Sequence, residues 1–336
     1  MTTSVASSPG GELVTVIVPL YNGAVTIGAT LASVRAQTWR NIEIIVVDDG
    51  STDQSPAIVE THAAADPRVR LLRQANAGVA AARNAGAAAA NGAFIAPIDA
   101  DDLWAPDKIA LQMRAMQEGG EGVGLVYTWY VEIDAEDRVI SSHHHPDNEG
   151  WVLGALCRTN FVGNGSSSLI RLSAFNDVGG YDPSLRARKA QGCEDLLLCL
   201  KVAERYEFRV IRSALTGYRI NSATMSNDVN QMHRSCKLVL DQFRASHPQY
   251  SRDIDAHMSQ VVGWLFAKAL VLGRLNQAAE LFRVMLKGDA QAALTTLAKT
   301  IPIAIRARAA RWAKSRFRPL ADSMTTRRPR FLAQWQ

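Results

Sequence analysis

Short runs of apolar, mostly β-branched residues alternate over the first 120 residues with longer segments in which apolar residues recur every three or four positions. A continuous apolar run is typical of a strand buried on both faces, and the longer spacing is typical of an amphipathic helix. Their alternation indicates a mostly parallel sheet with helices on both faces. The predicted strands span 14–19, 42–47, 69–72 and 94–98, and the predicted helices span 24–37, 54–64, 78–90 and 106–118.

The pattern is less regular after residue 127, and helical spacing dominates the last third of the chain. One strand is expected at 166–171, a helix at 193–204, and one or two strands at 208–220. From about residue 230 onward no segment is typical of a strand. The expected organisation is a disordered N-terminal tail (1–12), an α/β domain (13–228), a helical C-terminal region (229–300) and a basic amphipathic tail (301–336).

The composition is that of a soluble globular protein, since 47% of the 336 residues are apolar and 21% are charged. No apolar run approaches the ~20 residues that cross a bilayer, and the first residues do not have the pattern of a signal peptide. The four cysteines form no CxxC pair, which favours a reduced protein over a disulfide scaffold. We therefore expect a cytoplasmic protein.

The net charge of +5 is concentrated in the tail, where nine Lys or Arg stand against a single Asp from residue 301 onward. Apolar residues recur there at steps of three and four, with basic residues on another face. Two interpretations stay open: a helix lying on the anionic inner face of a membrane, or a helix docked on the main domain with a solvated basic face. Nucleic acid is not expected as a partner, because the rest of the chain is mildly acidic.

Acidic residues follow two of the predicted strands, at the end of the sheet where open α/β folds bind ligands. Asp99, Asp101 and Asp102 stand within four residues, and such carboxylates repel one another unless a cation lies among them. A Mg²⁺ or Mn²⁺ ion bridging to phosphate is one explanation, and an acidic loop with Asp102 as a helix cap is the other. Asp48 and Asp49 fit either a contact to a nucleobase or ribose, or a turn.

A series of motifs along the chain resembles glycosyltransferase family 2 over about two thirds of its length. The resemblance implies a GT-A fold, which is a Rossmann-like sheet, and a nucleoside-diphosphate sugar donor, most often linked to UDP. The motifs are VTVIVPLYNGAVTIGATLASVRAQTWRNIEIIVVDDGSTD, NAGVAAARNAG and GAFIAPIDADDLWAPDKI, followed by the looser SSSLIRLSAFNDVGGYDPSL, CEDLLLCLKV and YRINSATMS.

The same resemblance assigns roles to residues that match the family's motifs. Asp99 and Asp101 match the outer carboxylates of its D-x-D metal site, and Asp102 is a neighbouring candidate ligand. Glu194 and Asp195 match the acidic pair that supplies the catalytic base, with Asp195 as the first choice. The residues expected at the nucleotide are Pro19, Tyr21, Asn22, Asp48, Asp49, Arg83 and Asp99.

One late motif departs from the family's pattern. A histidine often follows Tyr-Arg there, whereas Asn221 occupies a place close behind Arg219 in this chain. Asparagine can bind through its carbonyl oxygen but has no basic imidazole. Arg219 is therefore an alternative contact to phosphate, and Trp151 is a candidate to stack against an acceptor sugar.

The predicted function is inverting, metal-dependent transfer of a sugar from a nucleotide-sugar to a hydroxyl of a saccharide or lipid-linked acceptor, in synthesis of a surface polysaccharide or glycolipid. A nucleotidyltransferase would also use paired carboxylates and a metal, but it should have a lysine-bearing glycine loop after the first strand, and residues 19–23 contain no lysine. A degenerate, non-catalytic nucleotide-sugar binding module is the third reading. The intact acidic pairs oppose it, and Asn221 favours it.

Overall fold

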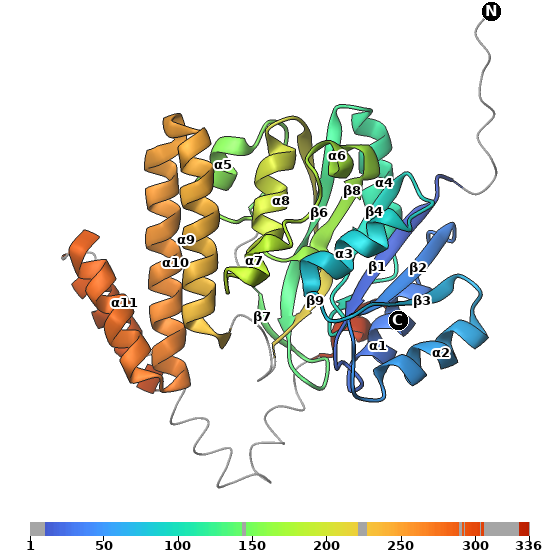
Figure 1. The fold of residues 1–336 in the computed structure, drawn as a ribbon, viewed down its shortest axis with the longest axis horizontal. Coiled ribbons are helices and arrows are strands. Elements are labelled where there is room, and N and C mark those ends of the chain that lie inside the picture. The colour runs from blue at the N-terminus through green and yellow to red at the C-terminus, as the bar shows by residue number, and fades with distance from the viewer. Residues whose placement is uncertain are drawn as a thin grey trace, which may run out of the picture.

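The computed structural model describes residues 11–142, 146–220, 227–288, 291, 293–302, 304–305 and 329–335, and its central feature is one nine-stranded sheet (Figure 1). Along the sheet the strands follow the order β3-β2-β1-β4-β8-β6-β9-β5, and β7 pairs with β6 outside this path. The strands are β1 (Val14–Leu20), β2 (Ile42–Asp48), β3 (Val69–Arg73), β4 (Phe94–Pro97), β5 (Leu103–Trp104), β6 (Val123–Ile133), β7 (Val139–Ser142), β8 (Ser168–Arg171) and β9 (Glu207–Arg219).

The first four strands form the parallel half of the sheet. β1 pairs in parallel with both β2 and β4, and β2 pairs in parallel with β3. All seven residues of β1 are buried, as expected for a strand covered on both faces. The helices that connect this half are α1 (Ile27–Arg35), α2 (Ser55–Ala65), α3 (Val79–Ala88) and α4 (Lys108–Gly119). These strands and helices fall close to the predicted ranges.

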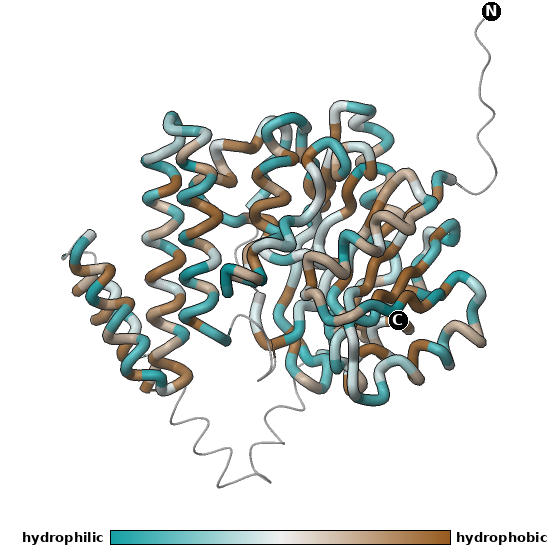
Figure 2. Tube along the Cα trace, viewed as in Figure 1, coloured by the Kyte–Doolittle hydropathy of each residue, from teal (hydrophilic) through white to brown (hydrophobic). Residues whose placement is uncertain are grey.

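Helices cover both faces of the sheet, which confirms the predicted fold class. Side chains of α1, α2 and α4 share one apolar cluster with β1 and β2, whereas α3 packs on the other face against Ile17 and Ile45. Figure 2 shows apolar positions gathered on the inner strands and polar ones along the outer helices. The carboxyl ends of the parallel strands consequently open to one edge, where their following loops meet.

The other half of the sheet is mixed and contains a strand that sequence analysis missed. β6 runs for 11 residues beside β9, in parallel, and antiparallel to β8. The segment after residue 127 was expected to be irregular. β9 is one continuous strand of 13 residues rather than two. The short helices nearby are α5 (Leu153–Arg158), α6 (Leu172–Asp177) and α7 (Ser184–Ala187), and the longer α8 (Glu194–Ala203) precedes β9.

Three long helices follow the last strand and lie along one side of the sheet domain (Figure 1). They are α9 (Val229–Ser246), α10 (Ser251–Leu272) and α11 (Leu275–Gly288). The Asp228 side chain caps α9 by accepting a hydrogen bond from the Gln231 backbone N–H, and Gly273 ends α10 with a left-handed φ of 78°. Apolar residues of α8, α9 and α10 belong to a single buried cluster, so the helices are packed onto the sheet domain.

The last described residues return to the sheet. Phe331 is 1% exposed and packs with Ile133 and Leu215, and its backbone N–H donates to the Asp137 carbonyl at 2.8 Å. The backbone of β7 is held too, through a 3.1 Å hydrogen bond from Val139 to the Pro329 carbonyl. Most of the predicted basic tail lies outside the described residues, as does nearly all of the predicted N-terminal tail. In the described residues, none of the helices is both long and apolar enough to cross a membrane.

Candidate active site

A cleft of about 1440 Å³ runs from the carboxyl ends of β1, β2 and β4, past the start of α8, to the wall formed by α10. It gathers most of the residues that the sequence singled out. Asp48, Asp102 and Trp151 are not among its lining residues, and Asn221 lies outside the described residues. The predicted residues that line it are Pro19, Tyr21, Asn22, Asp49, Arg83, Asp99, Asp101, Glu194, Asp195 and Arg219.

Asn22 and Asp49 tie together the loops at the nucleotide end of the cleft. Asn22 has a positive φ of 50° and its side-chain oxygen accepts from the Thr52 N–H at 2.8 Å. The Asp49 carboxylate accepts from the backbone N–H groups of Ala77 and Gly78, each at 2.7 Å, at the start of α3. The bonds of Asp49 hold the loop after β2 against the start of α3.

Asp48 and Tyr21 have different surroundings from these two residues. Asp48 is buried and accepts from the Ser51 N–H at 2.9 Å, which is the turn geometry that was the alternative to a ligand contact. Tyr21 is 56% exposed and stands on the cleft wall, where its ring is available for a planar ligand such as a nucleobase.

Arg83 lies at the centre of a buried ion-pair network. Its guanidinium, on α3, donates to Asp99 at 2.5 Å and to Glu194 at 3.1 Å, and its carbon lies 5.2 Å from the centre of the Tyr181 ring. Glu194 also accepts from the Gly192 N–H at 2.9 Å. A single cation therefore joins the acidic loop after β4 to the start of α8, and its loss would leave two carboxylates without a counter-charge.

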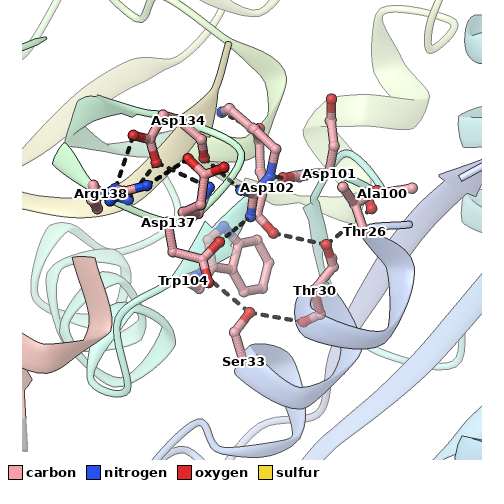
Figure 3. A network of polar contacts seen from close by, with 12 residues as sticks. Thr26, Thr30, Ser33, Ala100, Asp101, Asp102, Trp104, Asp134, Asp137 and Arg138 are labelled. Atoms are coloured by element: carbon pink, nitrogen blue, oxygen red, sulfur yellow. Dashed lines mark hydrogen bonds and ion pairs between the residues drawn. The ribbon is translucent and has the colours of Figure 1, made fainter. Parts of the chain in front are cut away.

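The three aspartates after β4 are not equivalent, and Figure 3 shows the surroundings of Asp101 and Asp102. Asp99 and Asp101 line the cleft, whereas Asp102 is fully buried beneath it. One oxygen of Asp102 accepts from the Ser166 hydroxyl at 2.5 Å, and the other accepts from the Arg219 N–H at 2.8 Å. Burial, and then the charges of Asp101 and Asp99, raise the pKa of Asp102 well above its ordinary value. Asp102 thus fixes the loop from inside.

A divalent cation fits the two outer carboxylates. Mg²⁺ and Mn²⁺ sites often use one or two carboxylates and leave other positions for water and phosphate, which is what Asp99 and Asp101 offer at the cleft. Across the described residues there is no cluster of three or more His, Cys, Asp or Glu side chains that could hold a metal ion. A metal held by Asp99 and Asp101 would need its further ligands from the substrate or from water.

Arg219 is engaged by the protein rather than extended into the cleft. Its guanidinium donates to the carbonyls of Asp101 and Asp134, both at 2.7 Å, and to the Asp137 carboxylate at 2.6 Å. The side chain is only 3% exposed. This arrangement favours a role in shaping the loop that bears Asp101 over the direct phosphate contact that sequence reasoning offered as an alternative.

Asp195 sits at the start of α8, in the middle of the cleft. Burial, followed by the negative charge of Glu194, raises its pKa from 3.8 to about 7, while Arg83 acts in the opposite direction. A carboxylate that titrates near neutral pH can take a proton and release it again. Both residues line the cleft, but the Glu194 carboxylate is bonded to Arg83 and to the Gly192 N–H, so Asp195 is the better candidate for a base.

Sequence reasoning missed one wall of the cleft apart from Tyr130, which it weighed as an aromatic that could stack against a sugar ring. Tyr130 and Glu132 of β6 line it, as do Trp264 and Lys268 of α10. The available signal was the spacing of Trp264, Ala267, Lys268 and Val271, which places all four on one helix face. Trp151, the aromatic residue chosen from sequence, is 68% exposed at the surface outside the cleft lining.

Solved structures share this fold. A mannosyltransferase from Pyrobaculum calidifontis, solved with GDP-Man and Mn²⁺, is 20% identical with a TM-score of 0.56, and the similarity covers 88% of this chain and 82% of that one. TarS 1–349 from S. aureus, solved with UDP-GlcNAc, is 17% identical with a TM-score of 0.54 over 88% of this chain and 87% of that one. At these identities the similarity establishes the GT-A fold.

Sequence comparison gives the family. An uncharacterized glycosyltransferase of Nostoc sp. is 39% identical over 219 residues, which are 62% of this chain and 65% of that protein. An uncharacterized glycosyltransferase of Rickettsia felis is 30% identical over 211 residues, and the chain spans only 33% of that longer relative. Residues 15–191, more than half of the chain, match the sequence model described as glycosyl transferase family 2. The chain therefore belongs to glycosyl transferase family 2.

Proposed function

We propose that this chain transfers a sugar, with inversion and with a divalent metal, from a nucleoside-diphosphate sugar to an acceptor hydroxyl. UDP is the first choice of nucleotide. The observation that carries the proposal is a single cleft in which Asp99 and Asp101 share a wall with Asp195, a carboxylate whose pKa is raised to about 7. The first two suit a metal-bound diphosphate, and the third suits a base.

In this mechanism Asp195 receives the proton of the acceptor hydroxyl. The acceptor oxygen forms a bond to the anomeric carbon as the bond from that carbon to the diphosphate oxygen breaks, and the electron pair leaves with the diphosphate. Asp99 and Asp101 would hold the Mn²⁺ or Mg²⁺, which supplies positive charge beside the leaving group. A single displacement inverts the anomeric centre and requires one base, which suits Asp195 because Glu194 is paired with Arg83.

The wider biological role belongs to the same proposal. Two proteins of the same fold bind UDP-GlcNAc and GDP-Man, so nucleotide-sugars are the donor class to test first. We place the reaction in the cytoplasm, in assembly of a surface polysaccharide or glycolipid, with the basic tail as the candidate contact to the inner face of the membrane. The division into a sheet domain (13–228), a helical region (229–300) and a tail (301–336) is the organisation that we propose for it.

Calorimetric titration with UDP and with GDP, each with and without Mn²⁺, tests the proposal. We expect metal-dependent binding of one nucleotide by the wild-type protein and its loss in Asp101→Ala. Asp147→Ala is the matched control, because that side chain is 72% exposed and does not line the cleft. Absence of nucleotide binding under all four conditions, or equal binding by Asp101→Ala, would overturn the proposed site.

A further inference from the structure

The cleft extends beyond Asp195 to a wall that the donor site does not use. Four residues of α10, spaced at i, i+3, i+4 and i+7, line this wall: Trp264, Ala267, Lys268 and Val271. The neighbouring positions Leu265 and Phe266 are buried in the core between helices. One face of α10 therefore anchors the helix, and the adjacent face is turned to the cleft.

Trp264 is the most unusual residue of this wall. Its side chain is 48% exposed, although a tryptophan on a packed helix usually buries most of its large apolar surface. The Lys268 ammonium lies 5.1 Å from the centre of the Trp264 ring. Burial lowers the pKa of Lys268 to about 8, while the charge of Glu132 on β6 opposes that shift. An aromatic surface, a cation and a carboxylate thus meet at one place.

Tyrosines complete the opposite side. Tyr130 of β6 and Tyr218 of β9 both line the cleft, with their ring centres 6.1 Å apart in an edge-to-face arrangement. These phenols, the Glu132 carboxylate and the Lys268 ammonium offer hydrogen bonds in the same cleft as the exposed Trp264 indole. A saccharide presents the matching pattern, because hydroxyls surround the apolar C–H face of its ring. A lipid chain would instead desolvate Lys268 and Glu132 without giving them hydrogen bonds.

The position of the α10 wall relative to Asp195 indicates whether the wall would hold the donor or the acceptor. The nucleotide end of the cleft, with Tyr21 and Asp49, belongs to the sheet, whereas α8 lies between the sheet strands and α9 and α10 (Figure 1). Asp195, the second residue of α8, lines the same cleft as Asp99 and Asp101 of the loop after β4 and as the four α10 residues. A base must contact the acceptor hydroxyl, and the acceptor therefore approaches from the side away from the diphosphate.

We propose that Trp264 and Lys268 form the acceptor subsite and that the acceptor group bound there is a saccharide ring stacked on Trp264. The inference rests on the proposed transferase function, which it deepens by naming the chemical class of the acceptor. Trp264 positions the ring, and Lys268 and Glu132 donate to and accept from its hydroxyls. The acceptor hydroxyl is thereby turned towards Asp195.

Saturation-transfer NMR tests the subsite with simple probes. The probes are the methyl α- and β-glycosides of glucose, galactose, mannose and N-acetylglucosamine, added to the full chain in a buffer that contains UDP and Mg²⁺, which is diamagnetic, in place of Mn²⁺. We expect ring protons of at least one glycoside to receive saturation in the wild-type protein. The signal should fall at least about tenfold in Trp264→Ala and be largely restored in Trp264→Phe, which keeps an aromatic face.

Trp151→Ala is the matched control, since it removes an exposed tryptophan outside the cleft lining and should leave the signal unchanged. UDP binding and the melting temperature, measured on every variant, separate loss of the subsite from loss of fold. Equal glycoside signals in Trp264→Ala and wild type, or no glycoside signal in a wild-type protein that binds UDP, would overturn the inference alone. A wild-type protein that binds neither UDP nor GDP would overturn the proposed function, and this subsite with it.

Discussion

At the scale of single residues, Asp195 combines two opposed requirements. A base must ionise, yet its position at the start of α8, beside Glu194 and partly buried, disfavours the charged form and raises its pKa from 3.8 to about 7. The folded protein therefore retains a proton that the unfolded chain releases between about pH 4 and pH 7. The stability that this group contributes is present below that pH window and is lost as pH rises through it. The ionised form that the reaction needs is therefore the form that destabilises the fold.

Asp195→Asn separates these two effects. The amide cannot ionise, so we expect the variant to melt at a higher temperature than wild type at about pH 8, with the difference shrinking towards about pH 4. Transfer should fall by ~10²- to 10⁴-fold, the usual contribution of a general base, while UDP affinity stays within about twofold. Thermal melting across pH and initial rates with a UDP-sugar check the prediction. Wild-type rates in the variant would assign the base to another residue.

The rate of the wild-type enzyme should report the same group. Since only ionised Asp195 can accept the proton, transfer at saturating donor should rise with pH and level off above about pH 7. The pH dependence of initial rates between about pH 5 and pH 9 measures this, with Asp147→Ala as a control that keeps the profile. A flat profile across that range would mean that Asp195 does not limit the reaction.

At the scale of elements, the aspartates of the loop between β4 and β5 have two different roles: one faces the ligand cleft, and another holds the loop in place. Asp101 lines the cleft, whereas Asp102 is fully buried and bonded to Ser166 and to the Arg219 backbone. Thr30 of α1 donates to the carbonyls of both Ala100 and Asp102, at 3.0 and 2.9 Å (Figure 3). The loop is therefore held from a helix, from β9 and from the residues before β8.

Asp101→Ala and Asp102→Ala should consequently fail in different ways. Asp101→Ala should lose metal-dependent UDP binding and cost less stability than Asp102→Ala, because Asp101 is half-buried at the cleft and Asp102 is fully buried. Asp102→Ala should cost about 1–3 kcal/mol, because the Ser166 hydroxyl and the Arg219 N–H lose their shared acceptor. Denaturant unfolding followed by circular dichroism measures both. If Asp102→Ala instead kept its stability and lost only metal binding, Asp102 would be a metal ligand, as the sequence first suggested.

Local patterns predicted the elements that bury both faces and missed those that depend on distant partners. β1, β2 and β4 are mostly apolar, and each of the four parallel strands is followed by polar residues that the parallel arrangement brings to one edge. β6 was not predicted because much of its pairing is with β9, which lies far along the chain. Its last residues are also a mixture of buried and half-buried positions. The place of Trp264 in the cleft was not predicted for a similar reason. Its exposure depends on how α10 packs and cannot be read from the sequence of its own segment.

At the scale of the whole molecule, the end of the chain is part of the sheet domain. Phe331 fills a site between β6 and β9, where a side chain on Gly217 would meet its ring at 3.0 Å. Asp137, whose carbonyl accepts from the Phe331 N–H, also pairs with Arg219. The docked C-terminus thus supports, through two contacts, the arginine that holds the Asp101 loop.

Docking of Phe331 complicates any test of the basic segment before it, because removing residues 301–336 would also remove this contact. Substitution is the cleaner experiment: six basic residues change to Gln and the length of the chain is kept. If the segment lies on a membrane, each basic residue contributes up to about 1 kcal/mol at an anionic surface, so binding to phosphatidylglycerol vesicles should weaken at least about tenfold. The six are Arg306, Arg308, Arg311, Lys314, Arg316 and Arg318.

Vesicle co-sedimentation measures this binding, with neutral phosphatidylcholine vesicles as the control for apolar adhesion. The wild-type protein should prefer the anionic vesicles and should release them as salt is raised, because screening shortens the reach of each charge to about 8 Å at physiological ionic strength. The melting temperature should not change, since the substitutions leave Phe331 and its site intact. Equal binding by wild type and variant would favour the docked helix with a solvated basic face, and the acceptor would then reach the α10 wall from solution rather than from a membrane.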